Sequence, residues 1–162
     1  ILSMLENLTL EAEVLKDSTL QNLPYKVELN RFGKLVLTPA SNKRGMIQSR
    51  VGFSIQNRRK DGEIINRCSV NTSDGVKVAD VAWASDEFIT EFGYKTPYDK
   101  APEICVEITS PSNSPEELRQ KIDLYLAKGA TEVWIVTEDG EMKVYNNRGE
   151  ANRSALVKKF KL

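Results

Sequence analysis

The stretch EICVEITSPSNSPEELRQKIDLYLAKGATEVWIV, residues 103–136, predicts a strand, a helix and a second strand in succession. Its first seven residues form an apolar run, and EVWIV at its end forms another. Between them, Ser114, Pro115 and Glu117 make a capping box, with serine at the N-cap, proline at the first helical position and glutamate at the third. We therefore expect a helix that begins there, runs to Lys128 and stops at Gly129.

The segments before this stretch supply further elements of the same core. EIINRCSV (63–70) and VKVADVAW (76–83) predict two strands joined by a turn at Asp74-Gly75. Apolar residues recur at i, i+4 and i+8 between 47 and 55, which predicts an amphipathic helix over 42–57. Short helices are expected over 86–92 and 9–16. The order from 42 to 136 is helix, three strands, helix and strand, so we expect an α/β fold with a mixed central sheet flanked by helices.

Two β-hairpins are expected to extend this core. The first covers 25–39, where Tyr25, Val27 and Leu29 alternate with polar neighbours before a tight turn at 31–33. The second joins MKVYN (142–146) to SALVKKF (154–160). At 162 residues the chain has the length of one domain, and we expect a single domain over 1–162.

Composition excludes several classes of function. The chain contains no histidine, which removes Ser-His-Asp and Cys-His catalysis, histidine-ligated zinc and imidazole proton shuttles. No apolar run approaches the ~18 residues of a membrane span, and no secretory signal is evident. Cys68 and Cys105 lie in strand-like runs without a CxxC motif, so we expect buried reduced thiols and a cytoplasmic location.

The formal net charge of zero hides a strong segregation of charge along the chain. Residues 29–60 contain eight basic residues and no acidic one, whereas residues 61–142 contain seventeen acidic residues and seven basic ones. Such asymmetry favours an anionic partner or a cation held by the acidic part. The alternative is that the basic and acidic faces neutralise each other across the fold.

Two carboxylates interrupt apolar strands. In VKVADVAW the strand pleat places Asp80 on one face with Val78 and Ala82, and in EICVEIT it places Glu107 with Cys105 and Thr109. A buried carboxylate pairs, binds a metal or stays protonated, and two neighbouring ones repel unless a cation lies between them. Oxygen ligands without histidine favour Mg²⁺ or Mn²⁺ over zinc.

The helix after residue 114 carries a lysine on its apolar side. On a helical wheel Lys121 falls inside the arc formed by the apolar residues of this helix. Such a lysine requires an acidic partner or an anionic ligand. The alternative is a structural ion pair with Glu107 or Asp80, or a side chain that extends along the helix to the surface.

These residues, on this order of elements, resemble the PD-(D/E)xK nuclease superfamily with its restriction endonuclease-like fold. Within it the chain resembles the Uma-type family of putative restriction endonucleases. The similarity is carried in order by VELNRFGKLVLTPAS, VADVAW, EICVEITSPSNS, LRQKIDLYLAKGATEVWIV and KVYN. The resemblance implies a Mg²⁺- or Mn²⁺-dependent endonuclease that hydrolyses DNA phosphodiester bonds.

The resemblance also implies roles for individual residues. Asp80 and Glu107, with the backbone carbonyl of Ile108, would hold the metal, although Ala79 stands where the superfamily usually has proline. Thr109 stands at the position where the common superfamily motif has its lysine. In the Uma-type family that lysine lies on the following helix, and Lys121 corresponds to it. Gln48 is a candidate accessory residue near the metal.

Partners follow from the same resemblance. Four arginines of the basic segment are candidates for DNA phosphate contacts, or alternatively form a solvated helix face: Arg44, Arg50, Arg58 and Arg59. A homodimer is expected because nucleases of this superfamily commonly cut two strands as dimers. The alternatives are a catalytically inactive nuclease fold that binds nucleic acid or a protein partner, and a structural interaction domain that dimerises through the apolar hairpins.

Overall fold

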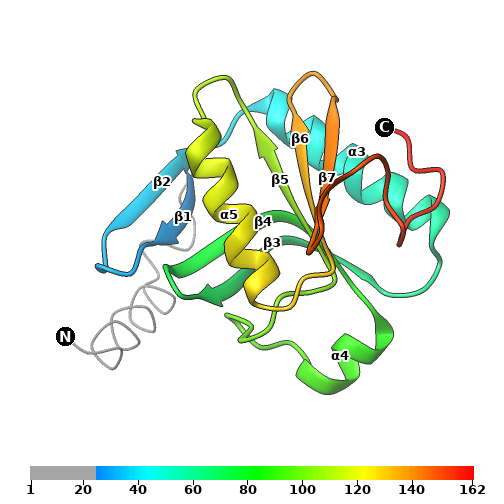
Figure 1. Ribbon diagram of the computed structural model, residues 1–162, viewed down its shortest axis with the longest axis horizontal. Helices are drawn as coiled ribbons and strands as arrows, with labels where there is room; N and C mark the ends of the chain where they lie inside the picture. Colours follow the sequence, from blue (N-terminus) through cyan, green and yellow to red (C-terminus); the bar gives the residue numbers. More distant parts are fainter. Residues whose placement is uncertain (1–24) are drawn as a thin grey trace.

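The computed structural model describes residues 25–162, and the helix expected over 9–16 lies outside this range. A six-stranded sheet has the order β3-β4-β5-β6-β7-β8 (Figure 1). Its strands are β3 (Glu63–Thr72), β4 (Gly75–Ala84), β5 (Ile104–Thr109), β6 (Glu132–Thr137), β7 (Met142–Asn146) and β8 (Gly149–Ala151). β5 and β6 are parallel and all other neighbours are antiparallel. The expected mixed sheet flanked by helices is thus confirmed.

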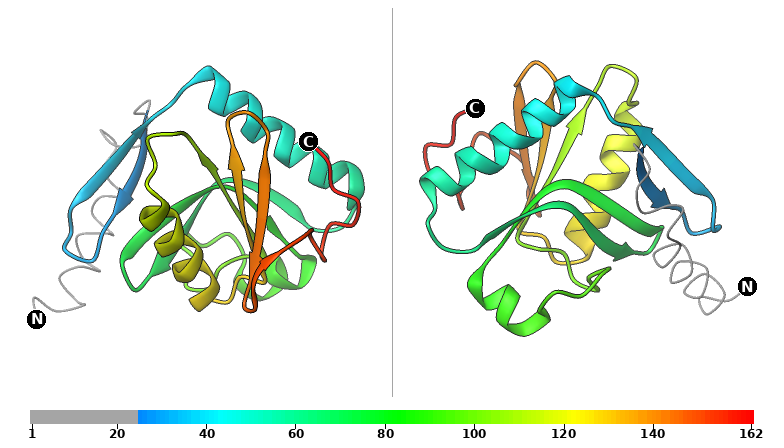
Figure 2. Two further views of the ribbon diagram at one scale, coloured as in Figure 1. Left: turned by 45° about the horizontal axis from the view of Figure 1, so that its top comes forward. Right: turned by 180° about the vertical axis from the view of Figure 1, so that it is seen from behind.

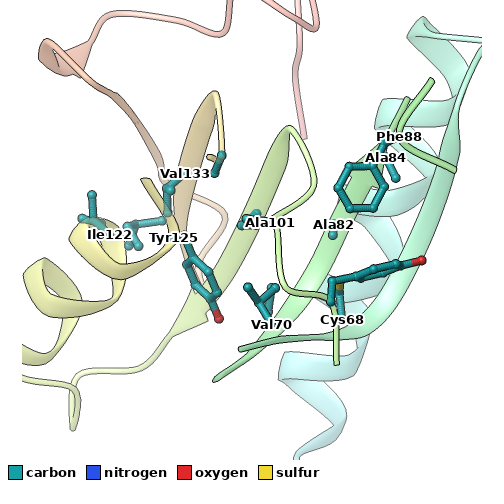
Figure 3. Close-up of a cluster of buried hydrophobic side chains, with 14 residues drawn as sticks. Cys68, Val70, Ala82, Ala84, Phe88, Ala101, Ile122, Tyr125 and Val133 are labelled. Atoms are coloured by element: carbon teal, nitrogen blue, oxygen red, sulfur yellow. The ribbon is translucent and has the colours of Figure 1, made fainter. Parts of the chain in front are cut away.

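Helix α5 (Pro115–Ala127) makes the crossover between the parallel strands β5 and β6 and covers one face of the sheet. The Ser114 hydroxyl accepts the N–H of Glu117 at 3.1 Å, which is the predicted N-cap. Ile122 and Tyr125 pack on that face in a cluster with Cys68, Ala82 and other residues (Figure 3). α4 (Asp86–Phe92), capped by Ser85, adds Phe88 to the same cluster.

Helix α3 (Asn42–Arg58) covers the opposite face and matches the expected 42–57 helix to within one residue (Figure 2). The i, i+4, i+8 residues Ile47, Val51 and Ile55 are buried there against Trp83 and Trp134. The sheet is therefore apolar on both faces, which explains why β4, β5 and most of β6 are buried.

The predicted N-terminal hairpin forms a separate two-stranded sheet from β1 (Tyr25–Leu29) and β2 (Leu35–Pro39). The hairpin packs on the β3–β4 turn, where the carbonyl of Leu29 lies 2.3 Å from the position that a Cβ on Gly75 would take. Only glycine, which also adopts a φ of +82° here, permits this approach. Glu28 Oε2 accepts the N–H of Val78 at 2.7 Å and fixes β1 against β4.

The pleat predicted for β4 holds only in part. Ala79 and Ala82 belong to the same core cluster although strict alternation places them on opposite faces, so the pleat changes phase around Asp80. On β3, Arg67 lies between the paired positions Asn66↔Val81 and Cys68↔Ala79, opposite Asp80, and its φ is +54°. Arg67 and Asp80 are thus left out of the regular strand pairing at the same level.

The C-terminal hairpin differs from the prediction. β7 pairs with the short strand β8 (Gly149–Ala151), whereas residues 154–160 form turns rather than a strand. This segment is held by the buried carboxylate of Glu132, which accepts the Ser154 hydroxyl at 2.6 Å and the Ala155 N–H at 2.8 Å. Hydrogen bonds to the Glu132 side chain thus hold residues 154–160 in place of the backbone hydrogen bonds of a strand pair. In the described part of the chain no helix has the length and apolarity to cross a membrane.

Candidate active site

A gap between β4 and β5 creates the site. The two strands pair only through Val81↔Val106, Ala82↔Cys105 and Trp83↔Ile104, and β5 then continues beside β6 alone. The N–H of Ile108, which lies beyond the last β4–β5 pair, donates to Asp80 Oδ2 at 2.8 Å. The carboxylate of Asp80 therefore takes the place of a backbone acceptor at the point where the strands separate.

The ammonium of Lys26, on β1, lies in this gap between two carboxylates. Its Nζ is 3.1 Å from Asp80 Oδ1 and 3.0 Å from Glu107 Oε2. All three residues are buried, with exposures of 7% for Lys26 and 3% for each acid. The two carboxylates predicted to share a cation thus converge on one, and the cation is a lysine of this chain.

Helix α5 supplies a second cation and a hydroxyl. Lys121 Nζ lies 2.8 Å from Glu28 Oε1 and 3.3 Å from Glu107 Oε1. One helical turn later, the Tyr125 hydroxyl donates to Glu107 Oε1 at 2.8 Å. The side chain of Lys121 is 20% exposed, so it faces the site from the solvent side while Lys26 faces it from within.

The pKa values reflect competition between burial and these neighbours. Burial opposes the charge of Lys26, but Glu107 and Asp80 outweigh it and hold the pKa of that ammonium above its usual range. Burial likewise opposes the charge of Glu107, yet Lys121 and Lys26 keep its pKa below the usual value. Burial and the charge of Glu107 raise the pKa of Asp80 against the effect of Lys26. Glu107 therefore carries the more firmly held negative charge.

The donor set suits a hard divalent ion. Asp80 and Glu107 already direct oxygens to one position, and Mg²⁺ is commonly held by one or two carboxylates with water and phosphate oxygens completing its shell. The described residues contain no group of three or more histidine, cysteine or acidic side chains arranged for a metal. Glu28, the third carboxylate nearby, is engaged by Lys121 and the N–H of Val78. An ion at this position would take the place of the Lys26 ammonium.

The structure separates the other predicted residues into near and distant groups. Ile108 is adjacent, since its N–H bonds Asp80 and its carbonyl accepts Arg44 Nη1 at 2.9 Å. Gln48 lines a small cavity beside Asp80 together with Arg44. Thr109 is buried at the end of β5 and lines a different groove, next to α5.

The remaining predicted arginines are not part of this site. Arg50 and Arg58 are exposed on α3. Arg59 is ion-paired with Asp61 and stacks over Trp83, at the far end of α3 from Arg44. A DNA contact by Arg50, Arg58 or Arg59 remains a prediction.

Lys26, Glu28 and Tyr125 are site residues that were not predicted from the sequence. In β1, Lys26 and Glu28 are buried while Tyr25 is 39% exposed, and Leu29 at the end of the strand is buried as well. The buried face of this strand carries charged side chains that contact other charged groups, and the hydrophobic alternation that predicted the strand gave no sign of them. The Lys121–Tyr125 spacing of one turn was an available signal for the tyrosine.

Comparison with known proteins identifies the family. The family model described as Uma2, "Putative restriction endonuclease", matches residues 12–157. The chain belongs to the Uma2 family. The crystal structure of a putative nuclease belonging to DUF820 from Anabaena variabilis ATCC 29413 shares its fold, with a TM-score of 0.63 and 17% identity over 84% of this chain and 86% of that one. No curated protein matches. The predicted family and restriction endonuclease-like fold are thus confirmed, and a nuclease function is supported in general terms.

Proposed function

We propose that this Uma2 protein is a Mg²⁺- or Mn²⁺-dependent endonuclease that hydrolyses phosphodiester bonds of DNA. The observation that carries the proposal is the convergence of Asp80 and Glu107 on one cation, with both oxygens within 3.1 Å of Lys26 Nζ. Membership of a family named for restriction endonucleases supports the same class of reaction.

Asp80, Glu107 and the carbonyl of Ile108 would hold the ion. When bound, the divalent ion polarises the scissile phosphate and lowers the pKa of a water molecule. The Tyr125 hydroxyl and Lys121 fix the orientation of Glu107 by holding its Oε1, which leaves Oε2 directed at the cation position. Lys121, partly exposed, would also stabilise the negative charge that grows on the phosphate in the transition state.

The decisive test is cleavage of supercoiled and linear DNA with Mg²⁺ or Mn²⁺. Asp80→Asn, Glu107→Gln and Lys121→Ala should each reduce the rate at least ~100-fold, since each removes a charged group that acts on the reacting phosphate. Asp123→Ala, which removes an exposed carboxylate on the same helix as Lys121, should cleave like the wild type. Circular dichroism would verify that every variant is folded. Cleavage that survives in all three site variants would refute the proposal.

A catalytically inactive nuclease fold that binds nucleic acid is the second candidate. The observation that favours it is Lys26 itself, because an ammonium group already compensates both carboxylates without a metal. This candidate predicts that the protein binds DNA with equal affinity with and without Mn²⁺ and never cleaves it.

We also propose that the active form is a homodimer, by analogy with superfamily nucleases that cut both strands. The exposed apolar side chains on β2, which include Leu35, Val36 and Leu37, offer a contact surface. Analytical ultracentrifugation of the wild type and of Leu37→Glu tests this expectation, because a monomeric wild type would exclude it.

A further inference from the structure

A small cavity adjoins the two carboxylates on the side of α3. It has a volume of about 60 Å³, enough for about four water molecules or one group of comparable size, and Lys26, Arg44, Gln48, Arg67 and Asp80 line it. We propose that this cavity binds a phosphate group of the nucleic acid, and that Lys26 becomes one of its ligands on leaving Asp80 and Glu107 when a divalent ion replaces it. This inference rests on the proposed function.

The charges around the cavity favour an anion. Three of its lining residues are cationic and only Asp80 is acidic. Lys26 pairs with Asp80 and Glu107, and Arg44 lies 4.0 Å from Glu138, so the third cation, Arg67, carries the positive charge that is not already compensated in the described structure. The cavity also lies against the first turns of α3, where Ser41 and Arg44 stand at the N-terminus of a 17-residue helix. The positive end of the helix dipole adds to the attraction for phosphate.

Lys26 is positioned to serve two partners. Its ammonium contacts Asp80 and Glu107, and the same side chain forms part of the cavity wall. A divalent ion between the carboxylates would repel the ammonium, and the cavity that Lys26 lines is open to it. Lys26 would thus neutralise the carboxylates before the ion enters and the phosphate afterwards.

Arg67 contributes a second cation that is free to bind. Within residues 25–162 its guanidinium has no ion-pair or hydrogen-bond partner, and the residue is exposed. Its φ of +54° is sterically unfavourable for arginine, and it occurs directly opposite Asp80. Backbone strain of this kind concentrates at functional sites, where the surrounding structure maintains it.

The test compares Mn²⁺ affinity, by calorimetry, with the affinity for a fluorescein-labelled DNA duplex, by anisotropy, in Mn²⁺ and in EDTA. Lys26→Met should bind Mn²⁺ about tenfold more tightly, because the competing ammonium is gone. It should nevertheless lose most of the Mn²⁺-dependent gain in duplex affinity. Arg67→Ala should bind Mn²⁺ like the wild type and the duplex about tenfold more weakly. Gel analysis after each titration would verify that the duplex is intact.

The controls are Lys158→Met and Arg148→Ala, which remove exposed cations remote from the cavity and should match the wild type. If Lys26→Met and Arg67→Ala both keep the full Mn²⁺-dependent gain, the phosphate site is wrong while the nuclease proposal stands. If the wild type shows no Asp80-dependent Mn²⁺ binding, the metal-dependent function fails, and the exchange proposed for Lys26 fails with it. If Lys26→Met does not fold, the duplex affinity of Arg67→Ala alone tests the phosphate site. Alanine keeps the Cβ of arginine, so this substitution leaves the backbone constraint at position 67 unchanged.

Discussion

Lys26 Nζ lies 3.0 Å from Glu107 Oε2 although 81 residues separate the two in the chain. The ion pair joins the N-terminal hairpin to the centre of the main sheet. Removing one member of a buried pair leaves the other charge without compensation, which costs about 3–5 kcal/mol. The pair therefore contributes both to the site and to the attachment of the hairpin.

This pair predicts a specific loss of stability at alkaline pH. The pKa of Lys26 is raised in the folded protein, because Glu107 and Asp80 outweigh burial, so its contribution is fully present below the usual lysine pKa of 10.5. The contribution declines as pH rises above that value, since the unfolded chain releases the proton first. Urea unfolding between pH 8 and 11.5 should show a decline that is steeper for the wild type and Lys158→Met than for Lys26→Met. Equal slopes would contradict the prediction.

Tyr125→Phe should weaken the acid resistance of the protein. The hydroxyl donates to Glu107 Oε1, and together with Lys121 and Lys26 it lowers the pKa of Glu107 against the effect of burial. Stability from a lowered carboxyl pKa is present above the usual value of 4.5 and is lost as pH falls toward about 2. Without the hydroxyl the pKa of Glu107 is lowered less, so the loss is smaller and is complete at a higher pH, and the free energy of unfolding at pH 7 falls by about 1 kcal/mol. The measurement is acid unfolding followed by circular dichroism. Tyr145→Phe is the matched control, because Tyr145 packs against the same core cluster and its hydroxyl makes no hydrogen bond in the described structure.

Glu132 and Glu107 should respond differently to substitution by glutamine. Both are buried in apolar strands, but Glu132 anchors the C-terminal segment through Ser154 and Ala155 and also accepts the indole N–H of Trp134 on its own strand. Glu132→Gln should lower the unfolding free energy by about 1–3 kcal/mol and leave DNA cleavage per folded molecule unchanged. Glu107→Gln should abolish cleavage. The prediction would be wrong if Glu132→Gln, at a temperature where it is fully folded, also cleaved DNA more slowly than the wild type.

Gly75→Ala should loosen the N-terminal hairpin. A Cβ at this position would meet the Leu29 carbonyl at 2.3 Å, and its φ of +82° is unfavourable for alanine. We expect a loss of more than about 2 kcal/mol in the free energy of unfolding. Hydrogen exchange should accelerate in 25–39 more than in β5 and β6. Gly140→Ala is the control, because its φ is also positive but nothing lies within 4 Å of the added carbon. Uniform acceleration across the sheet would refute a local effect on the hairpin.

Local sequence patterns predicted most of the core. The capping box at Ser114 and the i, i+4, i+8 pattern from Ile47 to Ile55 act within one helix, and both correspond to observed helices. The predicted strand from 154 to 160 failed because a single buried side chain, Glu132, holds that segment in turns. Such an anchor has no periodic signature.

The sequence by itself determined which chemistry is available: no histidine, carboxylates within apolar strands and a lysine on the apolar side of a helix. These are properties of single residues in their local pattern. Only the tertiary structure decided that Asp80 and Glu107 share a cation and that this cation is Lys26, a residue of the N-terminal hairpin that no sequence pattern singled out. The physical reason is that the contacts span 54 and 81 residues, and they depend on where β4 separates from β5 and where the hairpin packs.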